Sequence, residues 1–187
     1  MADETVSPQT LEVVFNVEDG TCVKNANSYI SLEDAIQFMT NKGRSDWLAL
    51  SSDEQKVTLI KGTQYVDNLY RWCGRRKFEN QALSFPRVRI RDYDGFEVKG
   101  IPSKLKEAVC EAAFYGYEAN AELWATYNEN GAIKRQRVEG AVEVEFFDST
   151  ETESTYISKY ASLDSLLKGL YMPKGSTSVC ARAGWES

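Results

Sequence analysis

The chain has 187 residues, of which 42% are hydrophobic and 27% charged, so it is long enough to bury the core of one domain. It contains no histidine, no Cys-x-x-Cys pair and no glycine-rich phosphate loop, which excludes the common catalytic triads, zinc sites and nucleotide-binding motifs. The net charge of −6 argues against a general nucleic-acid coat, and no apolar run is long enough to span a membrane.

These absences favour a protein that acts by binding. We expect no catalytic residue, no cofactor and no metal. The four cysteines lie far apart in the sequence, which argues against structural disulfides. Residues 1–9 lack the charged and then apolar pattern of a signal peptide, so we expect a protein made in the cytoplasm, with no membrane partner.

The N-terminal residues predict an arm followed by a hairpin. Residues 1–10 are polar and small, which is typical of a flexible arm that orders only on a partner. Leu11–Val17 has the composition of a strand, Asp19-Gly20 that of a tight turn, and residues 21–23 that of a short returning strand.

Ser31 begins the first predicted helix. Its hydroxyl and the carboxylate of Asp34 are placed as in a capping box, and the apolar residues that follow extend the helix to about Thr40. Gly43 supplies a left-handed stop.

Ser51 and Glu54 form a second capping box, which opens a longer helix whose apolar stripe continues to Tyr70. Trp47 lies just ahead of this helix. We expect its side chain to anchor the connection between the two helices.

A turn, a short strand and a third helix come next. Asp94-Gly95 marks the turn, Phe96–Val98 the strand and Ile101-Pro102 the start of the helix. Apolar and small residues then repeat every three or four positions from Leu105 to Leu123. We expect Gly116 to let a neighbouring helix approach closely, because a glycine inside a helix needs such compensation.

The C-terminal third predicts a strand, a short helix and a tail. Residues 138–147 alternate between apolar and mostly acidic side chains, which indicates an extended or β arm near 132–150. Residues 160–170 predict a short final helix, and residues 171–187 a docking tail. The chain therefore predicts a mainly α fold: a small bundle of about four helices in one domain (11–170), with short β-hairpin or extended-strand additions and flexible terminal tails.

The connection between residues 65 and 87 is the most informative segment. From residue 71 to 91, seven cationic side chains accompany one acid, Glu79, whereas residues 139–153 contain acids and no cation. Loops that carry several large apolar side chains are packed on something, either their own domain or another chain. The apolar side chains of this connection are Trp72, Phe78, Leu83 and Phe85.

Four sequence motifs carry a resemblance to a known family: Val17–Thr21, Asn25–Ala35, Gly74 with Arg76, and Gln81–Arg87. Together they resemble the head-to-tail connector, or neck adaptor, family of tailed phages, whose members are often labelled DnaT-like single-stranded DNA-binding proteins. The resemblance covers roughly residues 11–125. It implies a mainly helical protomer that forms a ring, commonly dodecameric, in the virion neck. Such a ring joins the portal protein to tail or nozzle proteins, and the double-stranded genome passes through it.

Two hypotheses remain for the cations Arg75, Arg76 and Lys77. In the first, they contact the portal or a neighbouring subunit, with the acidic residues 139–153 as pairing partners. In the second, they contact a DNA backbone, as in a single-stranded DNA-binding replication accessory protein. A solvated turn is the simplest alternative for these cations, and core packing is the alternative to base stacking for the nearby aromatic rings. The candidate interface residues are Arg71, Trp72, Arg75, Arg76, Lys77, Arg87, Glu143, Glu145, Tyr171, Arg182 and Trp185.

Overall fold

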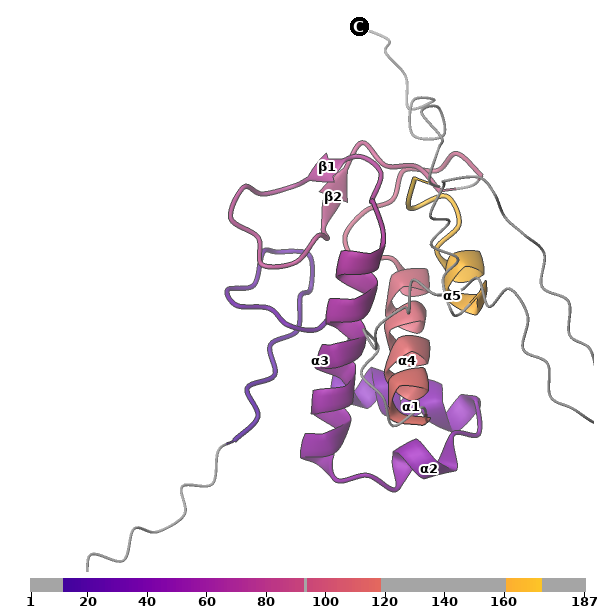
Figure 1. Cartoon of the computed structure of the whole chain (residues 1–187). Coiled ribbons are helices and arrows are strands. Elements are labelled where there is room, and N and C mark those ends of the chain that lie inside the picture. Colours follow the sequence, from indigo (N-terminus) through magenta and orange to yellow (C-terminus); the bar gives the residue numbers. More distant parts are fainter. Residues whose placement is uncertain (1–11, 93, 119–160, 173–187) are drawn as a thin grey trace, which may run out of the picture.

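A computed structural model describes residues 12–92, 94–118 and 161–172. Within these residues the fold is mainly helical, as predicted, with one two-stranded antiparallel hairpin (Figure 1). The elements in chain order are α1 (Leu32–Asn41), α2 (Ser45–Leu48), α3 (Ser52–Leu69), β1 (Arg75–Arg76), β2 (Arg87–Val88), α4 (Ser103–Glu118) and α5 (Ala161–Leu166).

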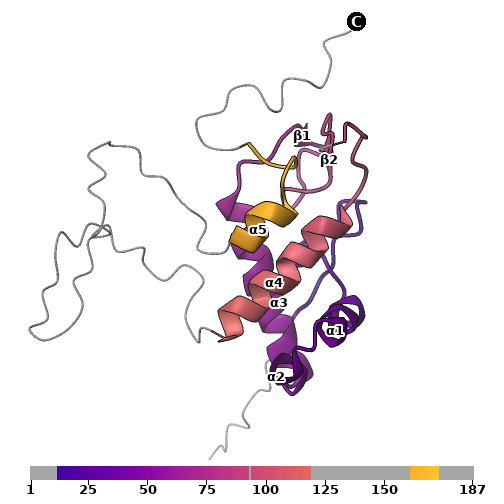
Figure 2. The same ribbon diagram turned by 90° about the vertical axis from the view of Figure 1, so that its right-hand side faces the viewer.

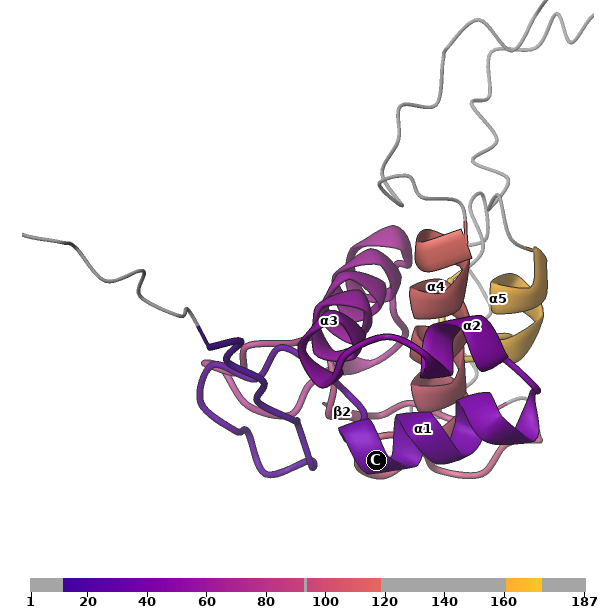
Figure 3. The ribbon, with the colours of Figure 1, turned by 90° about the horizontal axis from the view of Figure 1, so that it is seen from below.

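Helices α3 and α4 form the centre of the bundle, and α4 lies between α3 and α5 (Figure 3). The β1–β2 hairpin lies at one end of the bundle and α2 at the other (Figure 2). The predicted apolar stripes supply the core, because Leu59 and Val66 of α3 and Leu105 and Val109 of α4 are completely buried.

The backbones of α3 and α4 meet at Gly62. A Cβ atom at this position would lie 2.8 Å from the carbonyl oxygen of Val109 and 2.9 Å from the backbone nitrogen of Ala113, so no larger side chain fits without moving a helix. The close approach was predicted at Gly116 of α4, whereas this contact is made by a glycine of α3. Gly116 itself is half-buried.

Both predicted helix starts are confirmed. The hydroxyl of Ser31 accepts a hydrogen bond from the backbone nitrogen of Asp34 (3.1 Å), and α1 ends close to the predicted residue. At α3 the capping box is complete, because the Ser51 hydroxyl accepts from the Glu54 nitrogen and the Glu54 carboxylate accepts from the Ser51 nitrogen (2.9 Å). Gly43 has the predicted left-handed conformation (φ +68°).

Trp47 anchors the connection between α1 and α3, as predicted, although the short helix α2 that carries it was not foreseen. Its side chain is completely buried, and its indole nitrogen donates to the hydroxyl of Thr58 on α3 (2.9 Å). The indole therefore fills the core while its one polar atom keeps a partner.

Charged side chains fasten the end of α1 to α4. Glu111 of α4, which is nearly buried, pairs with Lys42 (3.3 Å) and Arg44 (3.5 Å), and the Arg44 guanidinium lies 3.9 Å from the centre of the Phe114 ring. Because the acid is shielded from water while its partners reach solvent, these contacts are stronger than ordinary surface pairs.

The predicted final helix is confirmed and closes the bundle. Leu163, Leu167 and Leu170 are buried. Beyond the helix the chain runs along residues 71–73. The Cys73 nitrogen donates to the Leu170 carbonyl (3.0 Å), and the Met172 nitrogen donates to the Arg71 carbonyl (2.7 Å).

The predicted N-terminal hairpin is wrong. Among residues 12–28 the only ladder contact is an isolated parallel bridge between Val17 and Ser28, and residues 21–23 form no strand. The buried carboxylate of Glu18 accepts hydrogen bonds from the backbone nitrogens of Gly20 (2.8 Å), Cys22 (3.0 Å) and Val23 (3.0 Å). These N–H groups are therefore satisfied by a side chain and not by a neighbouring strand.

The remaining expectations have mixed outcomes. The turn at Asp94-Gly95 is present, but the predicted strand 96–98 is reduced to a single bridge between Arg91 and Glu97. Cys73 is disulfide-bonded, so the expectation of no structural disulfide is wrong. The arm at 1–10, the continuation of α4 to Leu123, the strand and arm within 132–150, and the tail beyond residue 172 lie outside the described residues.

We predict that Gly62→Ala lowers the free energy of unfolding by about 1–3 kcal/mol, because the added methyl group overpacks the α3–α4 contact. The loss is expected even though alanine favours helix by about 1 kcal/mol over glycine. Urea denaturation followed by circular dichroism measures it. Lys61→Ala, one residue away on the exposed side of α3, is the control and should change stability by less than about 0.5 kcal/mol. A Gly62→Ala variant as stable as the wild type would contradict the contact.

Candidate functional site

The basic connection, residues 71–91, leaves the end of α3 and folds back over it. Tyr70 ends the helix in an extended conformation (φ −102°, ψ 139°). Trp72 then turns inward, where its indole nitrogen donates to the Asp67 carbonyl (3.2 Å) and its ring packs on Tyr70 and Phe85 at centroid distances of 5.6 and 5.0 Å. The predicted packing of Trp72, Leu83 and Phe85 is confirmed, since all three are buried.

Asp67, in the last turn of α3, holds the far side of the connection. Its two carboxylate oxygens accept hydrogen bonds from the Ser84 nitrogen (3.2 and 3.1 Å), and one of them also accepts from the Tyr29 hydroxyl. The same hydroxyl accepts from the Phe85 nitrogen (3.1 Å). Three segments that are distant in sequence are thus tied together at one half-buried carboxylate.

The electrostatics of this junction follow from its burial. Loss of water raises the pKa of Asp67 above its ordinary 3.8, while the hydrogen bonds from Tyr29 and Ser84 and the charge of Arg76 act in the opposite direction. The pKa of Tyr29 is also raised, first by burial and then by the neighbouring Asp67 carboxylate. Tyr29 therefore remains a hydrogen-bond donor to Asp67 throughout the physiological range.

Arg87 is used inside the connection. Its guanidinium donates to the carbonyl oxygens of Cys73 (2.6 Å), Ser84 (3.2 Å) and Gly74 (2.8 Å), and burial lowers its pKa. A guanidinium suits this position because its rigid fork carries five donors. Of the predicted interface residues, Arg87 is thus the one that braces the loop.

The hairpin gives the other cations a defined place. Arg75 pairs with Val88 and Arg76 with Arg87 across β1 and β2. Gly74 precedes the strand with a left-handed backbone (φ +66°), and a Cβ atom there would collide with the Val88 carbonyl. The strands therefore approach each other at a position that only glycine can occupy.

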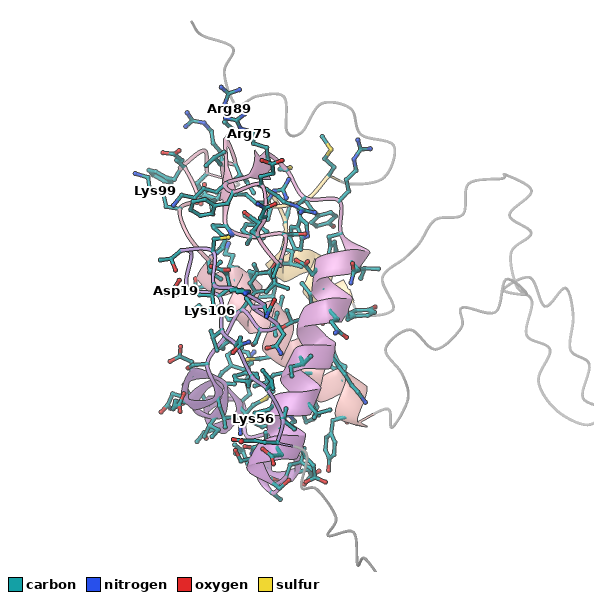
Figure 4. The ribbon with its side chains drawn as sticks, turned by 90° about the vertical axis from the view of Figure 1, so that its left-hand side faces the viewer. Asp19, Lys56, Arg75, Arg89, Lys99 and Lys106 are labelled. Carbon is teal, nitrogen blue, oxygen red and sulfur yellow. The ribbon has the colours of Figure 1, made fainter. Side chains whose placement is uncertain are left out.

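Six cationic side chains of residues 71–91 are exposed; Arg91 donates to the Gly95 carbonyl (2.7 Å), and the other five make no side-chain hydrogen bond to any described residue. They have no salt-bridge partner within residues 12–92, 94–118 and 161–172. Figure 4 shows Arg75 and Arg89 together at the hairpin end with Lys99 nearby, whereas Lys56 lies at the opposite end. We call the five the basic end: Arg71, Arg75, Arg76, Lys77 and Arg89.

Two phenylalanine rings accompany the basic end. Phe78 is 36% exposed, with the Lys77 ammonium 5.0 Å from the centre of its ring. Phe78 is therefore not packed into the core of its own domain, and its packing on another chain stays a prediction. Phe96 is 71% exposed beside the turn at Gly95, which the Asp92 carboxylate braces by accepting from the Phe96 nitrogen (2.9 Å).

The predicted interface residues lie in different environments, some exposed and some packed into the domain. Arg71, Arg75, Arg76 and Lys77 lie on the surface, and Trp72 is buried. Tyr171 packs against Tyr70 at a centroid distance of 4.7 Å, so its ring already contacts the domain. Glu143, Glu145, Arg182 and Trp185 lie outside the described residues.

Sequence reasoning missed the residues that position the site. These residues are Tyr29 and Asp67, which are far apart in the sequence, and no local pattern indicates that they meet. Within the part of the chain that the structure describes, no cluster of three or more acidic or cysteine side chains could hold a metal ion, and no helix is long and apolar enough to cross a membrane.

Residues 13–184 match the family described as "Putative DnaT-like ssDNA binding protein". The chain belongs to this family. No curated protein and no solved structure matches it. The matched range contains the basic end, the Asp67 junction and the final helix of this chain.

We predict that Asp67→Ala destabilises the fold, because the buried Tyr29 hydroxyl and Ser84 N–H each lose their acceptor at a cost of about 1–3 kcal/mol per group. The raised pKa of Asp67 sets the pH dependence. The folded protein keeps the proton to higher pH than the unfolded chain, so this stabilisation is complete below pH 3.8 and is lost as the pH rises through the folded-state pKa. Urea denaturation should therefore show a larger difference between wild type and variant at low pH than at neutral pH.

Glu79→Ala is the matched control, since Glu79 is an exposed acid in the same connection. Its effect should stay within about 0.5 kcal/mol. A cost for Asp67→Ala that grows with rising pH would contradict the assignment.

Proposed function

We propose that this protein binds single-stranded DNA through the basic end, and that it acts by binding without catalysing a reaction. One observation carries the proposal: Arg75, Arg76 and Lys77 are exposed and lack a salt-bridge partner among the described residues, although the loop that presents them is held rigidly. The description of the matched family supports the same conclusion.

The chemistry of the basic end suits a flexible strand. Guanidinium and ammonium groups bind phosphate oxygens and release the counterions of the strand. Phe78 and Phe96 expose ring faces on which unpaired bases can stack, a contact that tolerates any sequence. Because the stacking faces and the cations belong to one end, a strand can follow its backbone along the cations while its bases reach the rings.

The acidity of the whole chain is compatible with this role. The net charge of −6 repels DNA from most of the surface, whereas the basic end attracts it. Binding should therefore be local, and it should depend steeply on salt. This combination differs from that of a protein that coats DNA over its entire surface.

We predict that replacing Arg75, Arg76 and Lys77 by glutamine abolishes most of the salt dependence of single-stranded DNA binding. Binding to single strands loses about 0.7 in the slope of log K against log salt for each phosphate neutralised, so three lost contacts reduce the slope by about 2. Fluorescence anisotropy with labelled oligothymidylate at several salt concentrations measures the slope.

A charge-matched control replaces Lys42, Lys56 and Lys61 by glutamine; all three lie outside residues 71–91, and Lys56 lies at the opposite end of the molecule (Figure 4). The control should retain the wild-type slope. Equal loss in both triple variants, or no binding by the wild type at physiological salt, would contradict a DNA site at the basic end.

A second candidate function is the head-to-tail adaptor of a tailed phage. We propose it because motifs that resemble the connector family meet in space. The Tyr29 hydroxyl of the second motif accepts from the Phe85 nitrogen of the fourth, and the Arg87 guanidinium of the fourth donates to the Gly74 carbonyl of the third (2.8 Å). In this role the basic end contacts carboxylates of a protein partner.

The adaptor role assigns different partners to the chain. Copies form a ring, commonly of twelve, between the portal protein and tail or nozzle proteins in the virion neck after synthesis in the host cytoplasm. A closed ring needs two different complementary faces on each protomer. The double-stranded genome passes through without being gripped.

We predict for this second role that the protein binds purified portal protein in a ring, with one copy per portal subunit or a fixed multiple. Native mass spectrometry of the protein alone and with its portal measures the stoichiometry. Absence of a complex, together with no matching density at the neck in electron micrographs of the virion, would contradict the adaptor role and leave the DNA-binding role untouched.

A further inference from the structure

The N-terminal segment, residues 12–17, is bonded along one edge only. On that edge the Asn16 carbonyl accepts from the backbone nitrogens of Asn27 (2.8 Å) and Ser28 (3.1 Å), and the Glu18 nitrogen donates to the Ser28 carbonyl (2.8 Å). The segment follows an extended path beside α3 (Figure 1).

The side chain of Asn27 adds two more hydrogen bonds along this edge. Its amide oxygen accepts from the Asn16 nitrogen (2.9 Å), and its amide nitrogen donates to the Val14 carbonyl (2.8 Å). The backbone groups of Val14, Asn16 and Glu18 thus point toward residues 25–28. Because successive residues of an extended chain point to opposite edges, the groups of the intervening residues point away.

The outer edge, formed by Val13, Phe15 and Val17, has no hydrogen bond to any described residue. Beside it lies an open hollow of about 470 Å³ with a mixed lining: apolar side chains from residues 13–15, Val17 and Leu32, and polar ones from Glu12, Ser31, Glu33 and Lys56. An unbonded strand edge next to a hollow with apolar residues in its lining is an arrangement that recognises extended peptides, since the backbone supplies affinity and the hollow accepts a side chain.

The charges around the hollow are acidic. Glu12 and Glu33 are exposed and have no salt bridge with any described residue, whereas the nearby Lys56 ammonium is paired with Asp53 (3.0 Å). The surface therefore offers two free carboxylates and one cation that is already neutralised. A peptide that carries lysine or arginine beside an apolar residue complements this surface.

We propose that residues 12–17 form a docking edge for an extended basic segment of a partner protein. The segment adds as a strand along Val13, Phe15 and Val17, with one apolar side chain in the hollow and its cations beside Glu12 and Glu33. A second copy of this chain fits less well, because the edge spans only about six residues and a stable dimer needs about 800 Å² per partner. The docking edge is separate from the basic end and does not depend on the DNA-binding role.

The test uses the full chain and a labelled synthetic peptide, Lys-Val-Lys-Val-Lys-Val-Lys, in fluorescence anisotropy. Saturable binding is expected, with amide chemical-shift changes confined to residues 12–17 and 31–33. The double variant Glu12→Lys with Glu33→Lys should weaken binding about tenfold or more by reversing both carboxylates. Phe15→Pro should weaken it similarly, because proline removes a backbone donor of the outer edge.

Controls separate the docking edge from the other surfaces. Ile36→Ala, an exposed apolar residue of α1 that does not line the hollow, and the glutamine triple variant of the basic end should both bind the peptide as the wild type does. A peptide with alternate N-methylated amides should not bind, since it cannot donate to a strand edge.

Several results would overturn the proposal. These are equal binding of an alternating Glu-Val peptide, unchanged binding of the N-methylated peptide, and wild-type affinity in the double charge reversal. If the basic peptide fails to bind and sedimentation shows self-association that Phe15→Pro removes, the occupant of the edge is a second copy of the chain and the proposal is wrong.

Discussion

The partly buried carboxylate of Asp67 is the constraint on which the rest of the site depends. An ionised group shielded from water is tolerated only when its oxygens are hydrogen-bonded, and here they are shared between the Tyr29 hydroxyl and the Ser84 nitrogen. Meeting this requirement draws the connection back onto the end of α3 and seats Phe85 in the core. The loop between these fixed points, which carries Arg75, Arg76 and Lys77, faces outward as a result.

The cations of the connection fall into two groups: those that hydrogen-bond to the loop itself and those that are exposed to solvent. Arg87 meets three carbonyl oxygens that face inward and is used to hold the loop, whereas Arg75 and Arg76 occupy exposed positions of the facing strand. Phosphate and carboxylate each present a pair of anionic oxygens that a guanidinium can bind with two parallel hydrogen bonds. For this reason the DNA-binding and adaptor proposals invoke the same surface and differ in the partner that supplies the oxygens.

The two proposed binding surfaces have opposite charge. The basic end attracts anionic partners, while the docking edge is rimmed by Glu12 and Glu33. A protein with such separated surfaces can hold two different partners at once, because a partner that fits one surface is repelled by the other. The rigid α3–α4 pair, in backbone contact at Gly62, links the two surfaces through the body of the bundle.

The sequence by itself determined the helices other than α2, the serine caps that start α1 and α3, and the gathering of cations between residues 71 and 91. Those features are local: a serine cap bonds a nitrogen three residues away, and an apolar stripe repeats within one turn. Only the tertiary structure decided which cations are free, which aromatic ring is exposed, and that Glu18 takes the backbone donors that a predicted strand would have used. These outcomes depend on contacts between distant residues, such as Tyr29 with Asp67, and neither residue type nor spacing along the chain reveals which distant groups will meet.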